Sequence, residues 1–498
     1  MRWFSILFCG LLSLFIGRFA FAQQRPNVIL FISDDVSWND HGCYGNPAAR
    51  TPVIDQLAAR GLRFDQAFLT ASSCSPSRSS IITGRYPHNN GKAAELHQPI
   101  SANLAWFPAM LKEAGYYTVL SGKNHMSVGK LPAGTTASKH NKAWHHTSGG
   151  SGKRNTGGHA NWVKEVQKRP RDKPFFFWFA STDAHRGWNG DGEWNLRYGS
   201  KHRATDVIVP PFLIDSLGTR KDLASYYNEV TRFDFFIGEV VHELRRQKVL
   251  DNTLLLIMAD NGRPFPRAKT RLHDSGMKTP LVAHWPQVIK PNGVSSNLVS
   301  AIDIAPTILE AAGIKPAPSM QGVSFRPILE EPQATTRTSA FSEHNWHDYE
   351  AHGRSIRSEG YLLIRNFRPQ FAWQGPADSV RSPSHRELLA QKKLNKLTAA
   401  QAEVLVAPRA EIELYHPATD PHQLTNLAGL AKYSSVQLRL AETLEKWMDE
   451  THDSVPKNIS QDSFHRQTGA RLKNVKKYRG TTPGEDRQAD QTNAPGPR

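Results

Sequence analysis

The chain has 498 residues, of which 39% are hydrophobic and 21% are charged. This balance excludes a disordered or membrane-spanning chain and is typical of a soluble protein with one large core and a smaller satellite domain. The formal net charge of +17 predicts an anionic partner, which could be nucleic acid, an acidic membrane or a sulfated or carboxylated glycan.

Residues 1–24 have the pattern of a secretory signal. An arginine precedes an apolar stretch, and Ala20-Phe21-Ala22 supplies the small residues of a cleavage site, which places the cut after Ala22. Gly17 and Arg18 leave the apolar stretch too short to cross a bilayer, so we expect no transmembrane anchor. An exported chain, periplasmic or secreted, meets glycans rather than nucleic acid, so a glycan is the preferred partner.

Four short apolar runs, each followed by polar or charged residues, predict buried strands. They are residues 27–33 before Asp-Asp, 117–120 before Ser-Gly-Lys-Asn-His, 174–181 before Thr-Asp-Ala-His-Arg-Gly, and 253–259 before Asp-Asn-Gly. Continuous apolar runs of this length suit strands that are covered on both faces of a mostly parallel sheet. Helical patterns at 51–60, 105–114 and 226–246 alternate with them. The alternation predicts an α/β sandwich.

The polar residues after these runs predict a site, because ligands of α/β sheets bind beyond the carboxyl ends of the strands. Asp34, Asp35, Asp260 and Asn261 offer four oxygen ligands. Such an oxygen-only set suits a hard divalent cation, Ca²⁺ above all. The alternative is that these dipeptides are ordinary turn and cap residues.

The pattern changes after about residue 335. Residues 354–366 and 411–415 predict short antiparallel strands, and 435–450 predicts an amphipathic helix. We therefore expect an α/β catalytic domain at 23–335, an α+β subdomain at 336–455 and a basic, disordered tail at 456–498. The polar, glycine-rich segment 133–158 predicts a surface loop near the site.

Cleavage after Ala22 leaves only Cys43 and Cys74, which do not make a disulfide framework. Cys74 begins the sequence Cys-Ser-Pro-Ser-Arg, which Thr83-Gly84-Arg85 follows, and Pro76 is well placed to start a helix. A cysteine nucleophile would need a nearby base and a lowered pKa, and no local signature of a cysteine protease is present. A small buried cysteine fits poorly in so polar a run.

These residues resemble the type I sulfatases, in which C-x-P-S-R precedes T-G-R. The resemblance extends from about residue 25 to 450 and includes the opening strand with its metal pair, Ser-Gly-Lys-Asn-His, Asp-Asn-Gly, 298–313 and 413–428. It implies an alkaline-phosphatase-like fold with a large, mostly parallel sheet. It also implies a smaller C-terminal subdomain with a short antiparallel sheet and a helix.

Within the family, the chain is similar to the heparan N-sulfatase (N-sulfoglucosamine sulfohydrolase) branch. Asp-Asn-Gly followed by Pro-Phe-Pro and a basic residue is the pattern of that branch, and Lys269 stands where those relatives carry arginine. A lysine cannot donate two parallel hydrogen bonds to one oxyanion group as arginine can. Thr-Asp-Ala-His-Arg-Gly, with His185 and Arg186, is also similar.

The resemblance implies that a formylglycine-generating maturation enzyme oxidises Cys74 to formylglycine (3-oxoalanine), whose aldehyde forms a hydrate. A Ca²⁺ ion would bind Asp34, Asp35, Asp260, Asn261 and position 74, with Arg78 orienting the hydrate. One hydroxyl would attack sulfur and expel the sugar alcohol or amine.

The resemblance also implies roles for four other side chains. Lys123 and Lys269 would clamp the sulfate, and His185 would be the general acid for the leaving group. His125 would take a proton from the second hydroxyl, so that sulfate leaves and the aldehyde returns. Each of these residues alone could equally be a solvated or satisfied polar group.

Residues 343–357 are rich in histidine and aromatic side chains and predict substrate contacts from the C-terminal subdomain. His344, His347 and Arg354, together with Arg186, are the candidates, because a guanidinium pairs well with a sulfate or carboxylate. The alternative is a surface loop that leads into a strand.

Two other functions stay open at this point. A phosphatase or phosphonate monoester hydrolase of the same superfamily would share much of the site. A non-catalytic binder of anionic glycans would use the basic surface alone. The sulfated sugar, the choice between O- and N-sulfate, and the oligomeric state are open too.

Overall fold

The computed structural model describes residues 25–129, 142–149, 157–188, 194–473, 475 and 480–498. The predicted signal at 1–22 lies outside these residues, as do 133–141 and 150–156 of the predicted surface loop. Within the described ranges, none of the helices has the length and apolar character needed to cross a membrane.

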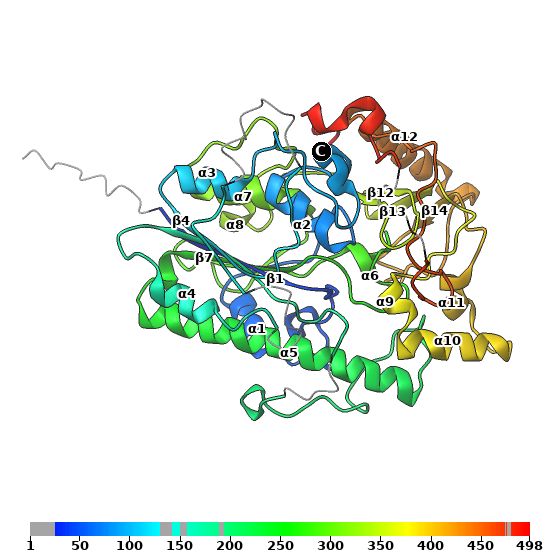
Figure 1. Ribbon diagram of the computed structural model, residues 1–498, viewed down its shortest axis with the longest axis horizontal. Helices are drawn as coiled ribbons and strands as arrows, with labels where there is room; N and C mark the ends of the chain where they lie inside the picture. Colours follow the sequence, from blue (N-terminus) through cyan, green and yellow to red (C-terminus); the bar gives the residue numbers. More distant parts are fainter. Residues whose placement is uncertain (1–24, 130–141, 150–156, 189–193, 474, 476–479) are drawn as a thin grey trace, which may run out of the picture.

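An eight-stranded sheet runs through the larger part of the molecule (Figure 1). Its order is β5 (His146–Ser148), β4 (Tyr117–Gly122), β6 (Phe175–Ala180), β1 (Asn27–Ser33), β7 (Thr253–Ala259), β8 (Leu281–His284), β2 (Leu62–Phe64) and β9 (Gly293–Ser295). Only the pairs that β8 makes with β7 and β2 are antiparallel. The four predicted apolar runs form the central strands β4, β6, β1 and β7, which confirms the mostly parallel sheet.

Helices cover both faces of this sheet (Figure 1). One face carries α1 (Pro52–Ala59), α4 (Trp162–Lys168) and α5 (Leu217–Arg246), and the other carries α2 (Cys74–Thr83), α3 (Phe107–Glu113), α7 (Ile304–Ala311) and α8 (Arg326–Glu330). Along β1, Ile29 and Phe31 pack with Phe233 of α5. Leu30 and Ile32 pack in the core on the other face, with α2, α3 and α7. Burial on both faces explains why this strand is apolar from Val28 to Ile32.

A four-stranded antiparallel sheet forms the smaller C-terminal part, as predicted. Its strands are β11 (Ala340–His344), β12 (Gly353–Ser358), β13 (Tyr361–Asn366) and β14 (Ile412–Tyr415). Glu359 and Gly360 have φ values of 53° and 78°, which suit the two-residue turn between β12 and β13. Helix α12 (Ser434–Glu450) covers the sheet, with Trp447 stacked on Phe341 at 4.9 Å between ring centroids.

Shorter elements complete the fold. They are the two-stranded sheet β3 (Ala67–Phe68) and β10 (Val299–Ser300), and the helices α6 (Asp274–Met277), α9 (Ala377–Val380), α10 (Pro383–Lys393) and α11 (Ala399–Ala402). Helices α9, α10 and α11 lie between β13 and β14 in the sequence. Helix α10 lies beside one end of α5 (Figure 1).

The chain beyond residue 480 differs from the disordered tail expected there. Buried Arg85 donates hydrogen bonds to the backbone oxygens of Asp490 and Thr492 and to Oδ1 of Asn493. Asn89 Nδ2 donates to the Ala489 oxygen at 2.7 Å. A buried guanidinium needs acceptors, and this segment supplies two backbone oxygens and one side-chain oxygen.

Candidate active site

The carboxyl ends of the central strands bring the predicted polar residues together. Asp34 and Asp35 follow β1, Lys123 follows β4, and Asp260 and Asn261 follow β7. Asp35 has φ 60°, a left-handed conformation that aspartate tolerates and that breaks the strand's alternation. Consecutive carboxylates can therefore face the same point.

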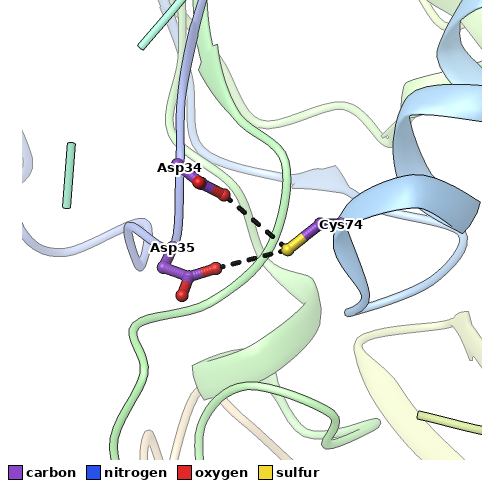
Figure 2. A group of neighbouring side chains, drawn as sticks. All are labelled: Asp34, Asp35 and Cys74. Carbon is purple, nitrogen blue, oxygen red and sulfur yellow. Dashed lines mark hydrogen bonds between the residues drawn. The ribbon is translucent and has the colours of Figure 1, made fainter. Parts of the chain in front are cut away.

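Cys74 is the first residue of α2 and faces this pair of carboxylates. Its Sγ lies 3.7 Å from Oδ1 of Asp34 and 3.7 Å from Oδ1 of Asp35. Figure 2 shows the two carboxylates at the end of β1 and the cysteine at the start of α2 pointing toward one another. Cys74 is 2% exposed, so the thiol lies inside the protein.

Three cations neutralise the three carboxylates of the site. The Nζ atom of Lys123 lies 2.5 Å from Asp34 Oδ2, and Nζ of Lys269 lies 2.8 Å from Asp35 Oδ2. Nε of Arg78 lies 2.8 Å from Asp260 Oδ2. Burial would raise the pKa of Asp34, but the charges of Lys123, His185, Arg78 and Lys269 hold it below its ordinary value. The formal charge of the three pairs together is zero.

The Cys74 thiol is unsuited to act as a nucleophile in its own right. Burial raises the pKa of the thiol well above its ordinary value; the charges of Asp34 and Asp35 add to the rise, while Lys123 and Lys269 oppose it. Because the thiolate is the reactive form, a thiol with a raised pKa is inert at neutral pH.

The oxygen atoms around Cys74 fit a divalent cation. Asn261 Oδ1 is buried and has no hydrogen-bond partner among the described residues, while its Nδ2 donates to Asp35 Oδ1 at 2.5 Å. Burial raises the pKa of Asp260 to about 7, with Asp34 and Asp35 adding to the rise and Arg78 and Lys123 opposing it. Crowded carboxylates and an unpartnered amide oxygen are the surroundings that a hard cation stabilises.

The loop that carries Lys269 is attached to the segment before Cys74. The Thr270 N–H donates to the backbone oxygen of Ser72 at 3.0 Å and to its Oγ at 3.1 Å. Arg267 donates to the His422 oxygen at 2.8 Å and contacts Glu403 at 3.1 Å. These contacts fix Lys269 relative to α2.

His125 is paired with His97, a residue that the sequence analysis did not single out. His125 Nε2 lies 2.6 Å from His97 Nδ1, so one ring donates to the other. His125 Nδ1 is buried and has no partner among the described residues. Burial and the charges of Lys123, His97 and Arg78 lower the pKa of His125 to about 2. The His125 ring is therefore neutral at physiological pH.

His185 lies near Asp378 of α9, a second residue that sequence reasoning missed. The His185 Nε2 atom is 3.8 Å from Asp378 Oδ2, and Nδ1 lies 3.0 Å from the Arg186 backbone oxygen. Asp183, in the same loop, is held by Arg232 at 2.7 Å. No motif marked Asp378, because it reaches the site from a different part of the chain.

Arg186, expected to contact substrate, has other partners in the structure. Its guanidinium makes two hydrogen bonds to Asp222 of α5, at 2.7 and 2.9 Å, and one to the Pro264 oxygen. It also lies over the rings of Trp188 and Phe265. These contacts attach the His185 loop to α5.

The candidates from the C-terminal part divide into two groups. His347 reaches the site, because its Nδ1 lies 2.6 Å from Oγ of Ser73, the residue before Cys74. His344 is buried against Trp373. Arg354 is fully buried and makes two hydrogen bonds to Asp453, at 2.6 and 2.8 Å, so it has an internal ion-pair partner instead of an open face for substrate.

Comparisons with known proteins agree with this geometry. The family model described as sulfatase matches residues 26–314, and the model described as N-sulphoglucosamine sulphohydrolase, C-terminal, matches residues 267–410. The N-sulphoglucosamine sulphohydrolase of Homo sapiens is 31% identical over 486 residues, which cover 89% of this chain and 94% of the relative. An ulvan-active sulfatase of Formosa agariphila is 27% identical and covers 85% of this chain and 75% of the relative.

A solved structure, described as a complex with its substrate D-glucosamine-2-N,6-O-disulfate, has the same fold. It aligns with a TM-score of 0.62 at 19% sequence identity, over 86% of this chain and 98% of that chain. This likeness confirms the predicted alkaline-phosphatase-like α/β fold.

Proposed function

Because this chain belongs to the sulfatase family, and is thus a sulfuric ester hydrolase, we propose that it is an exported sulfatase of sulfated glycans. It would act through a formylglycine at position 74 and a bound Ca²⁺ ion. The observation that carries this proposal is the buried set of three carboxylates, three cations and Asn261 around Cys74. Family membership confirms the resemblance drawn from the motif at Cys74.

Formylglycine is the form of position 74 that would make this site reactive. The side chains that would hold Ca²⁺ there are Asp34, Asp35, Asp260 and Asn261, with position 74 beside them. Once present, the ion would supply positive charge to a sulfate oxygen, and the hydrated aldehyde would supply the nucleophilic oxygen. The inert thiol of Cys74 supports a need for this modification.

Lys123 and Lys269 would bind the sulfate oxygens. Each already contacts one carboxylate of the neutral cluster. A divalent cation added to that cluster gives it a net charge of about +2, which favours an anionic group at the same point and stabilises charge that builds on its oxygens. Arg78 would orient position 74 from one turn further along α2.

Two histidines would move protons. His185 Nε2 would donate a proton to the leaving oxygen or nitrogen, because its Nδ1 is already bonded to the Arg186 backbone oxygen. His125 Nδ1 would accept the proton released from position 74, because it is a ring nitrogen without a hydrogen-bond partner among the described residues. His185 would thus act as the acid and His125 as the base.

A sulfated glycan is the substrate class that the chain's features favour. The formal charge of +17 attracts polyanions, and the related proteins are an N-sulphoglucosamine sulphohydrolase and an ulvan-active sulfatase. His347 comes from the C-terminal part and would meet the sugar, and His344, buried against Trp373, would support it. Arg186 and Arg354 would support this surface through their ion pairs, without contacting substrate directly.

Maturation would come before folding. Cys74 is 2% exposed, so a formylglycine-generating enzyme could reach it only in an extended chain, before α2 packs. Export fits this order, with residues 1–22 as signal, 23–335 as catalytic domain and 336–455 as subdomain. In this division, residues from 456 onward would be a C-terminal extension that closes over Arg85.

Sulfate release from defined substrates tests the proposal. Protein made in cells with a formylglycine-generating enzyme should release sulfate from heparan, chondroitin, carrageenan, fucoidan or ulvan fragments. Parallel reactions with aryl phosphate and aryl phosphonate esters should be slower. A higher rate on phosphate or phosphonate, or binding of glycans with no release of sulfate, would overturn it.

A further inference from the structure

Asp378 brings a carboxylate from the C-terminal part of the chain to the open edge of the active site. It lies on α9, where the Ala377 N–H donates to Asp348 Oδ2 at 3.0 Å. Its own Oδ1 accepts a hydrogen bond from the Ser379 N–H at 2.6 Å. The side chain is 20% exposed, whereas those of Asp35 and Lys269 are at most 1% exposed. The fixed position of Asp378 and its exposure suit a group that meets substrate.

The other oxygen of Asp378 faces the candidate general acid. Oδ2 lies 3.8 Å from His185 Nε2, and one oxygen of Asp378, one of Asp35 and a ring nitrogen of His185 lie within 4.8 Å of one another. His185 Nδ1 is engaged with a backbone oxygen, so Nε2 is the nitrogen available for chemistry. A general acid must come within about 3 Å of the atom that it protonates. A leaving atom that approaches Nε2 from the side of Asp35 and Asp378 would therefore lie near the Asp378 carboxylate.

Oδ2 of Asp378 is an open acceptor. Within the described part of the chain, no hydrogen bond to this oxygen is present, because Ser379 uses Oδ1 and Arg186 uses Asp222. Burial would raise the pKa of Asp378, but Lys269, His185 and Arg186 hold it below its ordinary value. The carboxylate is thus ionised at neutral pH and ready to accept a hydrogen bond.

We propose that Asp378 selects N-sulfated over O-sulfated sugars by accepting a hydrogen bond from the sulfamate N–H. This inference rests on the proposed function. A sulfamate nitrogen carries one hydrogen, whereas the bridging oxygen of a sulfate ester presents only lone pairs, which a carboxylate repels. A site built to bind an N–H discriminates strongly against the analogue that lacks it.

The Asp378 carboxylate would also stabilise the amine product. When an oxygen of the hydrate at position 74 bonds to sulfur and the S–N bond breaks, nitrogen keeps the electron pair and takes a proton from His185 Nε2, which leaves a free amine. That amine becomes an ammonium ion in water, and Asp378 is the carboxylate beside it. An alcohol released from a sulfate ester gains no such charge, so the preference holds on both sides of the reaction.

The test compares two substrates in the matured enzyme with Ca²⁺ present. Glucosamine N-sulfate carries the N–H, and 4-nitrophenyl sulfate does not. Asp378→Asn and Asp378→Ala should lower kcat/KM for glucosamine N-sulfate at least about 10-fold and change that for 4-nitrophenyl sulfate less than about threefold. Asp378→Glu should recover part of the loss. Melting temperatures within a few degrees of wild type would show that the variants fold.

Three results would overturn the inference. They are an equal loss on both substrates in a folded variant, no loss on either, or a wild-type enzyme that releases sulfate only from O-sulfated sugars such as glucosamine 6-sulfate. A wild-type enzyme that releases no sulfate from any substrate would instead contradict the proposed function. The two failures are therefore distinguishable.

Discussion

Arg78 Nε lies 2.8 Å from Asp260 Oδ2, and neither side chain is exposed to solvent. The pair joins α2, one turn after Cys74, to the residue that follows β7. Arg78 also donates to the Lys123 backbone oxygen at 3.2 Å, beyond the end of β4. One guanidinium therefore connects three of the segments that form the site.

Removing this guanidinium should destabilise the fold as well as stop catalysis. Arg78→Ala leaves Asp260 buried without its partner, and breaking a buried ion pair in this way costs about 3–5 kcal/mol. Urea unfolding of the unmatured protein measures the loss without involving turnover. Arg439→Ala is the matched control, because its pair with Glu359 is exposed and should contribute less than about 1 kcal/mol. Equal, small losses in both variants would contradict this role of Arg78.

Calcium should stabilise the folded chain through Asn261. We expect chelation to lower the melting temperature, because an ion at 100 times its dissociation constant stabilises a protein by about 2.7 kcal/mol. Asn261→Ala should raise the dissociation constant at least about tenfold by removing one of the oxygen ligands. Glu445→Gln, on the exposed face of α12, is the control. Calorimetric titration with Ca²⁺ measures the dissociation constant of each variant. An unchanged dissociation constant in Asn261→Ala would exclude Asn261 as a calcium ligand.

Protonation of His385 should lower the free energy of unfolding at acidic pH. This histidine is buried at the start of α10 without a ring partner among the described residues, and burial lowers its pKa to about 4. The unfolded chain therefore binds the proton first, and stability falls as pH decreases from about 6.5 to 4, by up to about 1.4 kcal/mol per pH unit. His385→Gln should flatten that part of the curve of unfolding free energy against pH. Identical slopes for the two proteins would show that His385 does not contribute.

The C-terminal segment should stabilise α2 through Arg85. A chain that ends at residue 480 loses three acceptors of this buried guanidinium, which Asp490, Thr492 and Asn493 supply. Hydrogen bonds to charged groups contribute about 1.5–3 kcal/mol each, although water will replace part of them. We expect a lower melting temperature and faster proteolysis near Arg85. Asn493→Ala should give a smaller shift in the same direction, and no shift in the truncated chain would indicate that the segment only lies on the surface.

Much of the fold could be predicted because strands that are buried on both faces consist mainly of apolar residues. Residues 28–32 of β1, 175–180 of β6 and 254–259 of β7 are all apolar, since both faces of the sheet are covered, and this indicates central parallel strands. The edge strands β5 and β9 have three residues each and partly exposed side chains, so their sequences contain no continuous apolar run. The composition of the segment after residue 480 does not reveal its contact with Arg85, because two of the three acceptors there are backbone oxygens.

The residues of the candidate site were predictable where they follow strands or belong to a local motif. Asp34, Asp260 and Cys74 come together as their positions in the α/β pattern require. Asp378 and His97 could not be found in this way, because long stretches of chain separate them from their partners and only the folded structure pairs them. Arg354 looked suited to bind an anion, but its charge is paired internally with Asp453.

The oxidation of position 74 decides whether the site is reactive, and the mass of a tryptic peptide measures it directly. Trypsin releases residues 64–78 from protein made with a formylglycine-generating enzyme, and the account predicts a peptide lighter than the cysteine form by about 18 Da. The rate of sulfate release should rise in proportion to the fraction of chains that carry formylglycine. Cys74→Ala should show neither the lighter peptide nor sulfate release. Full sulfatase turnover with an unmodified Cys74, or with Cys74→Ala, would contradict the account.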